Sequence, residues 1–319
     1  MTGPDGSVNR FPSPDLLGLG TWLFGWETVE SDARQLMGMA LDHGITYFDT
    51  ANNYGGGESE RIVGDFLRSN RDEVIVGTKC FAPFGPEPED RGLSRQAIIR
   101  AVHGSLDRLR TDRIDLLHLH RPDPSVPVEE TAGTLTDLVR AGAVRQVATS
   151  TFHGHQIDAL QKALVAADVT PAVLDQAPYS LLERQVEAVA AAAIRSWGMT
   201  VTAWSPLGEG LLTGKYADTR AEGRIRRWQV SGQERFQRGI ETAGRLRELA
   251  DRASMGLDEL ALSWLARRPL VGRVLIGART VGQFETYLRG VQAEYPAELE
   301  PEIDSIVPPG TTVLEHYAT

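Results

Sequence analysis

Eight short β-rich runs alternate with longer amphipathic segments along this chain, from about residue 16 onward. Strict alternation of this kind predicts parallel strands joined by helical crossovers. The expected strands are 16–22, 45–49, 73–79, 114–120, 144–150, 172–176, 199–204 and 273–278. The expected helices are 31–44, 58–69, 94–109, 128–141, 155–166, 182–197, 257–268 and 280–290. Eight such units without a Pro/Ser-rich linker favour an α/β fold of one closed (β/α)8 barrel, the TIM barrel, over an open sheet.

The boundaries follow from local signals. In the helix expected at 31–44, Ser31 is a candidate N-cap and Gly44 a C-terminal stop. Residues 205–256 interrupt the alternation with a long polar loop after the seventh strand and an extra helix near 234–253. That insertion either covers the functional face of the barrel or forms a solvated surface loop. We expect an N-terminal tail over 1–15 and a single barrel domain over 16–319.

Composition excludes several classes of protein. The 319 residues are 41% hydrophobic and 24% charged, which suits a globular core, and the formal net charge is -10. A negative balance of this size argues against nucleic-acid partners and anionic membranes. The single cysteine, Cys80, excludes an internal disulfide and suggests a reducing compartment. The first residues lack the apolar stretch of a signal peptide, so we expect a cytoplasmic protein.

Chemically reactive side chains close three consecutive strands. Asp49 ends the second strand, Lys79 the third and His120 the fourth, and Tyr54 follows five residues after Asp49. Neighbouring strands lie about 4.8 Å apart, so these four side chains can meet at the C-terminal rim, where such barrels place their active sites. Together they indicate a proton-transfer site, in which Lys79 pairs with Asp49 and lowers the pKa of Tyr54. The plainer alternative is a rim ion pair beside an ordinary loop tyrosine.

A second group of features follows the seventh and eighth strands. The segments "WSPLGEGLLTGKY" (204–216) and "GARTVGQ" (277–283) combine glycines, which allow close backbone approach, with Lys215 and Arg279. Barrels of this class often bind phosphate in these two loops. On an acidic chain, this local positive charge indicates a phosphorylated cofactor or substrate.

Taken together, these segments resemble the aldo-keto reductase family. The resemblance covers nearly the whole chain in one order: "LGLGTW", "GITYFDTANNYGGGESERIVG", "VGTK", "DRIDLLHLHRPDP", "AWSPLGEGLLTGKY" and "GART". It implies a TIM barrel that binds a nicotinamide dinucleotide, usually NADPH, and transfers hydride from it to a ketone or aldehyde. In that scheme Tyr54 protonates the forming alkoxide, Lys79 and Asp49 tune Tyr54, and His120 orients the carbonyl.

The resemblance also implies cofactor contacts. Ser150 and Gln176 match the groups that hold the carboxamide, Trp204 the residue that stacks on the nicotinamide ring, and Arg279 a 2′-phosphate ligand. The full set of expected cofactor-binding residues is Thr21, Trp22, Asp49, Ser150, Thr151, Gln176, Trp204, Ser205, Pro206, Leu207, Gly210, Lys215, Gly277, Arg279 and Gln283. Two positions depart from the family pattern, since Thr151 and Tyr287 stand where asparagines are usual.

The two histidines of "LLHLH" raise the question of a metal site. His118 and His120 point to the same side of a strand, and His153 and His155 are the other nearby candidates. Zinc needs three or four ligands, and no cysteine or further cluster lies at a matching spacing. We therefore expect no metal, with His118 as a hydrogen-bonded interior residue.

Two other functions remain open. One is a non-catalytic or regulatory NADP(H)-binding protein on the same fold, and the other is a barrel isomerase or lyase that uses Lys79 and Tyr54 for proton transfer. The substrate of a reductase would be a small carbonyl compound, bound by a monomer or weak oligomer. Candidate residues for its pocket are Trp22, Trp26, Phe81, Phe84, Trp228 and the arginine-rich loop 220–227.

Overall fold

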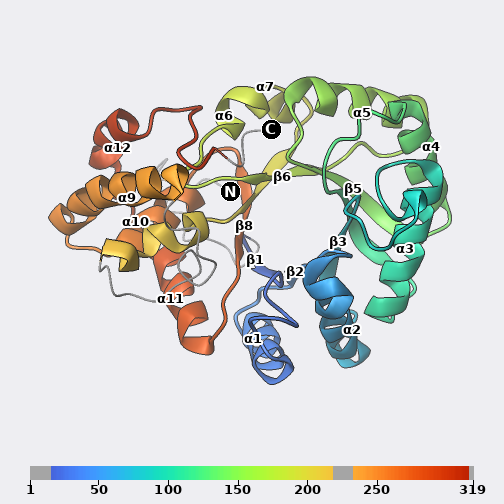
Figure 1. The fold of residues 1–319 in the computed structure, drawn as a ribbon, viewed down its shortest axis with the longest axis horizontal. Coiled ribbons are helices and arrows are strands. Elements are labelled where there is room, and N and C mark those ends of the chain that lie inside the picture. Colours follow the sequence, from blue (N-terminus) through green and yellow to red (C-terminus); the bar gives the residue numbers. More distant parts are fainter. Residues whose placement is uncertain (1–15, 218–232, 316–319) are drawn as a thin grey trace, which may run out of the picture.

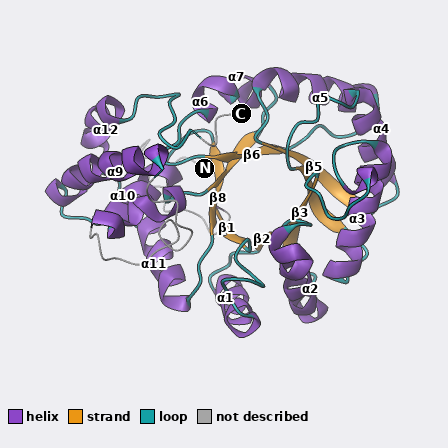
Figure 2. Cartoon of the chain, in the orientation of Figure 1, coloured by secondary structure: helices purple, strands orange, loops and turns teal. Residues whose placement is uncertain are grey.

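The strands close into one parallel barrel. The computed structural model describes residues 16–217 and 233–315. Its eight strands are β1 (Leu17–Gly20), β2 (Tyr47–Asp49), β3 (Ile75–Cys80), β4 (Ile114–Leu119), β5 (Val144–Ser150), β6 (Leu174–Pro178), β7 (Thr200–Trp204) and β8 (Val271–Ile276). They pair in sequence order, and β8 returns to β1, which confirms the expected TIM barrel. Figure 2 shows the strands as a ring with the helices outside it.

The helices cover the outer face of that ring (Figure 1). They are α1 (Glu30–Asp42), α2 (Glu58–Asn70), α3 (Arg95–Leu109), α4 (Val128–Arg140), α5 (Gly154–Ala166), α6 (Val186–Val189), α7 (Ala191–Ser196), α9 (Glu234–Arg252), α10 (Leu257–Ala266), α11 (Val281–Gln292) and α12 (Glu300–Ile306). Short 3-10 turns are η2 (Tyr54–Gly57), η3 (Pro88–Asp90), η4 (Gly208–Thr213), η5 (Lys215–Ala217) and η6 (Ala297–Leu299). None of the helices in the described ranges is long and apolar enough to cross a membrane.

Helix and strand patterning explains the two parts of the core. The amphipathic helices bury an apolar stripe, as α2 does with Ile62, Val63 and Leu67. A second, smaller cluster fills the inside of the barrel, where alternate strand residues point inward. Its members are Tyr47, Leu116, Ala148, Leu174 and Leu275.

Two expectations about the helices are wrong. The first helix begins at Glu30 behind Val29, so Ser31 lies in its first turn and is not the N-cap. Gly44 does follow this helix in a left-handed conformation, with φ +74°. The helix expected at 182–197 is two helices, because Ala190 leaves helical geometry with φ -132° and ψ -21°.

The insertion after β7 contributes to the functional face. Helix α9, expected near 234–253, packs on η4 so closely that a Cβ on Gly239 would lie 2.7 Å from Leu211 Cδ1. The N-terminal tail 1–15, most of the loop 217–233, the arginine-rich 220–227 segment and Trp228 lie outside the described residues.

Packing between α2 and α3 provides a test of this fold. A Cβ on Gly64 would lie 2.5 Å from the Arg108 carbonyl oxygen, so Gly64→Ala should push the helices apart. We expect a loss of about 1–3 kcal/mol in the free energy of unfolding, measured by urea denaturation. Gly133 in α4 has no atom within 4 Å of its Cβ position, so Gly133→Ala should instead stabilise by about 0.5–1 kcal/mol. Equal stability of the two variants would contradict this packing.

Candidate active site

The centre of the site is a buried ion pair between β2 and β3. Lys79 Nζ lies 2.7 Å from Asp49 Oδ2, and their side chains are 0% and 4% exposed. Lys79 also donates to the Thr50 carbonyl oxygen at 2.7 Å. Because burying an unpaired ammonium would be costly, these two acceptors are what allows Lys79 to lie inside the barrel. The pair expected from the strand ends is therefore present.

Asp49 is also held by β6 directly and by β4 through Tyr47, which lies on the same strand as Asp49. Gln176 Nε2, on β6, donates to Asp49 Oδ1 at 2.7 Å, and Tyr47 OH lies 3.3 Å from the same oxygen. Tyr47 OH is also 2.9 Å from His118 Nε2, so a hydrogen-bonded chain runs from β4 to Asp49. His118 is fully buried and does not line the cavity, which confirms it as an interior hydrogen-bonded residue.

Tyr54 is carried on a turn of three glycines. Gly55, Gly56 and Gly57 have φ of +57°, +67° and +91°, the left-handed region in which residues with a Cβ are strained. The turn brings the Tyr54 ring over Lys79, whose Nζ lies 4.9 Å from the ring centroid. The ring centroids of Tyr54 and His120 are 6.2 Å apart. All four expected side chains thus lie at one place.

Burial sets the protonation state of this group. The expectation that Tyr54 has a lowered pKa is wrong in its net direction: burial raises the Tyr54 pKa, and the charge of Lys79 opposes that rise only in part. Burial, together with the charges of Lys79 and Arg121, lowers the pKa of His120 to about 3. Near neutral pH, Tyr54 is therefore a protonated phenol and His120 a neutral imidazole.

A cavity of about 640 Å³ opens above these residues. Sixteen of the expected site residues line it: Trp22, Asp49, Tyr54, His120, Ser150, Thr151, Gln176, Trp204, Ser205, Pro206, Leu207, Gly210, Lys215, Gly277, Arg279 and Gln283. Lys79 lies beneath the wall. Thr21 is turned away, since its hydroxyl bonds the Asp49 carbonyl oxygen at 2.8 Å and Ser59 Oγ at 2.7 Å.

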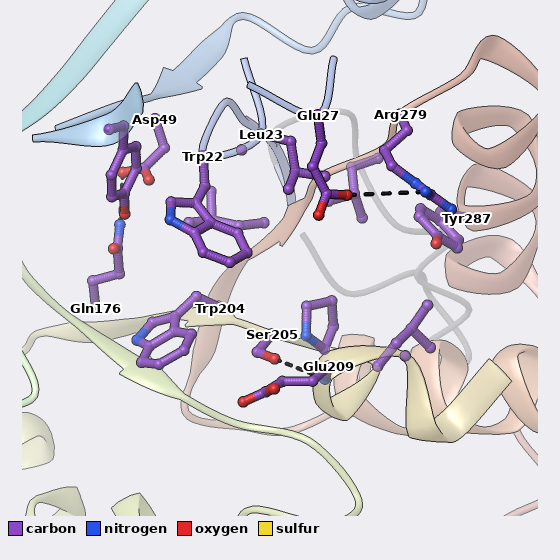
Figure 3. A pocket seen from close by; sticks show the side chains of 18 of the residues that line it. Trp22, Leu23, Glu27, Asp49, Gln176, Trp204, Ser205, Glu209, Arg279 and Tyr287 are labelled. Carbon is purple, nitrogen blue, oxygen red and sulfur yellow. Dashed lines mark hydrogen bonds and ion pairs between the residues drawn. The ribbon is translucent and has the colours of Figure 1, made fainter. Parts of the chain in front are cut away.

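The cavity has two chemically different ends. Figure 3 shows Asp49, Gln176 and Trp204 at one end and Glu27, Arg279 and Tyr287 at the other. Arg279 Nη1 lies 3.9 Å from Glu27 Oε2, so a carboxylate of the β1 loop already faces this arginine. Glu27 lies in a loop without a recognisable motif, and sequence reasoning missed it.

Loop geometry at the two ends suits a dinucleotide. After β7, Ser205, Gly208, Glu209 and Gly210 all have positive φ, and Lys215 Nζ would lie 3.4 Å from a Cβ on Gly210. The φ of +90° disfavours a side chain at position 210, which keeps the backbone there open beside the lysine. After β8, the Arg279 amide donates to Gln283 Oε1 at 3.0 Å, which fixes the start of α11. The side chains of Lys215 and Arg279, which line the cavity beside these turns, are suitable partners for phosphate groups.

The loop after β5 rests on a buried carboxyl. Thr151 has φ +58°, a strained value for a β-branched residue, and Ser150 Oγ donates to the Gln176 carbonyl oxygen at 2.9 Å. Beneath them Asp175 Oδ1 accepts from Thr149 Oγ1 at 2.7 Å and from the Phe152 amide at 3.4 Å. Asp175 Oδ2 is buried without a hydrogen-bond partner, and burial raises the pKa of this carboxyl to about 6.

The described ranges, 16–217 and 233–315, contain no group of three His, Cys, Asp or Glu side chains placed to hold a metal ion. His153 and His155 stack edge to face, with ring centroids 6.0 Å apart. His153 precedes α5, and His155 lies in its first turn. Neither histidine lines the large cavity.

Comparison with known proteins covers nearly the whole chain. The model of the aldo/keto reductase family matches residues 16–308. An uncharacterized oxidoreductase of Bacillus subtilis (strain 168), YrpG, is 35% identical over 315 residues, with 94% of each chain covered. The aldo-keto reductase YhdN of the same strain is 36% identical over 279 residues, covering 84% of this chain and 82% of its own. A probable voltage-gated potassium channel subunit beta of Arabidopsis thaliana is 31% identical over 287 residues, covering 86% and 87%.

The buried Asp175 carboxyl gives a prediction about stability and pH. Its folded pKa of about 6 lies above an unfolded value near 3.9, so the folded state holds the proton more tightly. Stability contributed by this proton is present below about pH 4 and is lost as pH rises through 6, by about 2–3 kcal/mol. The variant Asp175→Asn lacks this loss, so its advantage over wild type in urea denaturation should grow between pH 4.5 and 7.5.

The control is Asp112→Asn, because the Asp112 side chain is 87% exposed and its 3.5 Å contact with Arg113 Nη1 is a surface ion pair of the kind that contributes little. Its stability relative to wild type should stay constant over the same pH range. A constant difference for Asp175→Asn as well would contradict a protonated, buried carboxyl.

Proposed function

The chain belongs to the aldo/keto reductase family, and we propose that it is an NADPH-dependent carbonyl reductase. The observation that carries the proposal is the convergence of Tyr54, His120 and the Asp49–Lys79 pair at one end of the cavity. The phosphate-binding features of Lys215 and Arg279 belong to the same cavity. One continuous space thus offers a proton donor and a place for a dinucleotide.

The residues present fit such a cofactor. Ser150 and Gln176 are polar groups on the wall beside Asp49, where they can bond a carboxamide, and Trp204 offers an aromatic face near them. Lys215, beside the left-handed turn after β7, would bind the pyrophosphate, and Arg279 the 2′-phosphate. When bound, NADPH supplies the hydride that reduces the carbonyl carbon.

Side chains of the protein supply the proton and stabilise the charge that its transfer creates. The Tyr54 hydroxyl donates its proton to the carbonyl oxygen as negative charge develops there, and the neutral His120 imidazole bonds and orients that oxygen. Lys79 stabilises the resulting phenolate because its charge lies beside the ring. Asp49 holds Lys79 in place and keeps it protonated. The high Tyr54 pKa ensures that the donor carries its proton at neutral pH.

Two other functions receive less support. A regulatory NADP(H)-binding protein is suggested by the relative named as a probable potassium channel subunit beta. That role does not require Asp49, Tyr54, Lys79 and His120 to be gathered at one point. A barrel isomerase or lyase would use Lys79 and Tyr54 but would not need Trp204 and Arg279 in the same cavity.

Removal of the proton donor tests the proposal. Tyr54→Phe should lower turnover of a panel of aldehydes, ketones and diketones by at least about 100-fold, because general acid catalysis contributes that much. NADPH affinity, measured by fluorescence titration, should stay within a few-fold. Tyr295→Phe, which removes a hydroxyl bonded to Glu300 far from the cavity, should keep turnover. Wild-type rates in Tyr54→Phe would remove this residue from the mechanism.

A second variant tests cofactor choice. Arg279→Ala should weaken NADPH about tenfold or more and NADH much less, because a charged hydrogen bond to the 2′-phosphate contributes about 1.5–3 kcal/mol. Lys215→Ala is the matched control, since a pyrophosphate contact should weaken both cofactors alike. The measurement is the dissociation constant of each cofactor for each variant. Equal losses of NADPH and NADH in Arg279→Ala would rule out 2′-phosphate recognition by this residue.

A further inference from the structure

Arg121 is a charged residue of the cavity wall that neither the proton-transfer group nor the cofactor contacts use. It follows His120 directly, beyond the end of β4, and lines the cavity. Its Nη1 atom is buried and has no hydrogen-bond partner. Among residues 16–217 and 233–315, no carboxylate lies at ion-pair distance from its guanidinium.

An arginine in this state needs an anion. A guanidinium keeps its charge at every physiological pH, and leaving a charged donor buried without an acceptor costs free energy. Asp175 attracts Arg121 electrostatically, but it lies outside the cavity wall and uses Oδ1 for Thr149 and the Phe152 amide. No described side chain or backbone group bonds Nη1, so a group that enters the cavity can supply its acceptor.

Arg121 lies beside the reacting end of the cavity, since it directly follows His120 in the chain. Asp49 is paired with Lys79, and Glu27 faces Arg279 at the opposite end of the cavity. Arg121 acts electrostatically on both His120 and Tyr54, which places its charge close to the groups that receive the carbonyl. Lys215 and Arg279 belong to the loops after β7 and β8.

We propose that Arg121 determines specificity by binding an anionic substituent, a carboxylate or a phosphate, of the carbonyl substrate. The inference rests on the proposed reductase function and names the substrate class of that site. The planar guanidinium can bind a carboxylate or phosphate through two parallel hydrogen bonds. Trp22 and Leu23 line the same cavity and offer apolar surface for the carbon skeleton of such a substrate.

Paired substrates with and without an anionic group test this directly. The pairs are 4-carboxybenzaldehyde with 4-formylbenzamide, and glyceraldehyde 3-phosphate with glyceraldehyde, which separates carboxylate from phosphate. Wild type should prefer the charged member of at least one pair by tenfold or more in kcat/KM. In Arg121→Gln that preference should disappear, mainly through KM, with a change below about threefold for the neutral member. Arg121→Lys should restore part of it, since the charge returns without the fork.

Arg235, a second cavity arginine with a buried Nε lacking a hydrogen-bond partner, provides the matched comparison. Loss of the preference in Arg235→Gln but not in Arg121→Gln would overturn the proposal. Equal kcat/KM for charged and neutral members in wild type would also overturn it, while leaving carbonyl reduction intact.

A binding measurement separates failure of this proposal from failure of the reductase function. If no carbonyl compound is turned over, the proposed reaction falls, and benzoate and inorganic phosphate are then titrated calorimetrically into the protein with NADP⁺ present. Binding of one anion by wild type and at least tenfold weaker binding by Arg121→Gln supports an anion site at Arg121. Equal binding by both proteins, or none by wild type, overturns it. Thermal unfolding of each variant verifies that it is folded.

Discussion

The interior of this barrel depends on one desolvated ion pair, Asp49 with Lys79. Because both side chains are almost fully excluded from water, each needs every partner that the fold provides. Lys79 donates hydrogen bonds to Asp49 and to the Thr50 carbonyl oxygen, while Asp49 accepts one from Gln176 across the barrel. Removing one member would leave the other as an uncompensated buried charge, a loss of about 3–5 kcal/mol. The interactions that stabilise the barrel are therefore the same ones that position the proposed chemistry.

Exclusion of water also fixes which groups carry protons. Desolvation disfavours charge on any group, so it keeps Tyr54 a neutral phenol and His120 a neutral imidazole beside a lysine that stays charged only because Asp49 holds it. The resulting site has one mobile proton, on Tyr54, and one fixed positive charge beneath it. Such an arrangement can stabilise the negative charge that develops on a substrate oxygen. Before that charge develops, Tyr54 keeps its proton and remains neutral.

Features set by neighbouring residues in the sequence were predicted, whereas features set by contacts between distant segments were not. Strand order and the meeting of Asp49, Lys79 and His120 follow from alternation and from the position of each residue at a strand end, which are local features. The predicted direction of the Tyr54 pKa shift was wrong because the shift depends on burial by surrounding residues that are far apart in the sequence. The missed Glu27 and Arg121 lie in loops, and only the folded chain shows that one faces Arg279 and the other lacks an acceptor. The break at Ala190 likewise has no signal in an alanine-rich run that suits a helix throughout.

The glycine turn that carries Tyr54 has a consequence for how such a protein can diverge. A Cβ on Gly55 would lie 2.9 Å from the Phe24 carbonyl oxygen, and one on Gly57 would lie 2.9 Å from Arg108 Cδ, while Gly56 is held by its φ alone. Gly55 and Gly57 therefore leave no room for a side chain, Gly56 adopts a conformation that favours glycine, and none of the three lines the cavity. Substitutions in the cavity walls can change which substrates bind. The glycine turn, in contrast, keeps the position of Tyr54 fixed. Related proteins should therefore differ in substrate specificity through their cavity walls while the Tyr54 hydroxyl keeps its place.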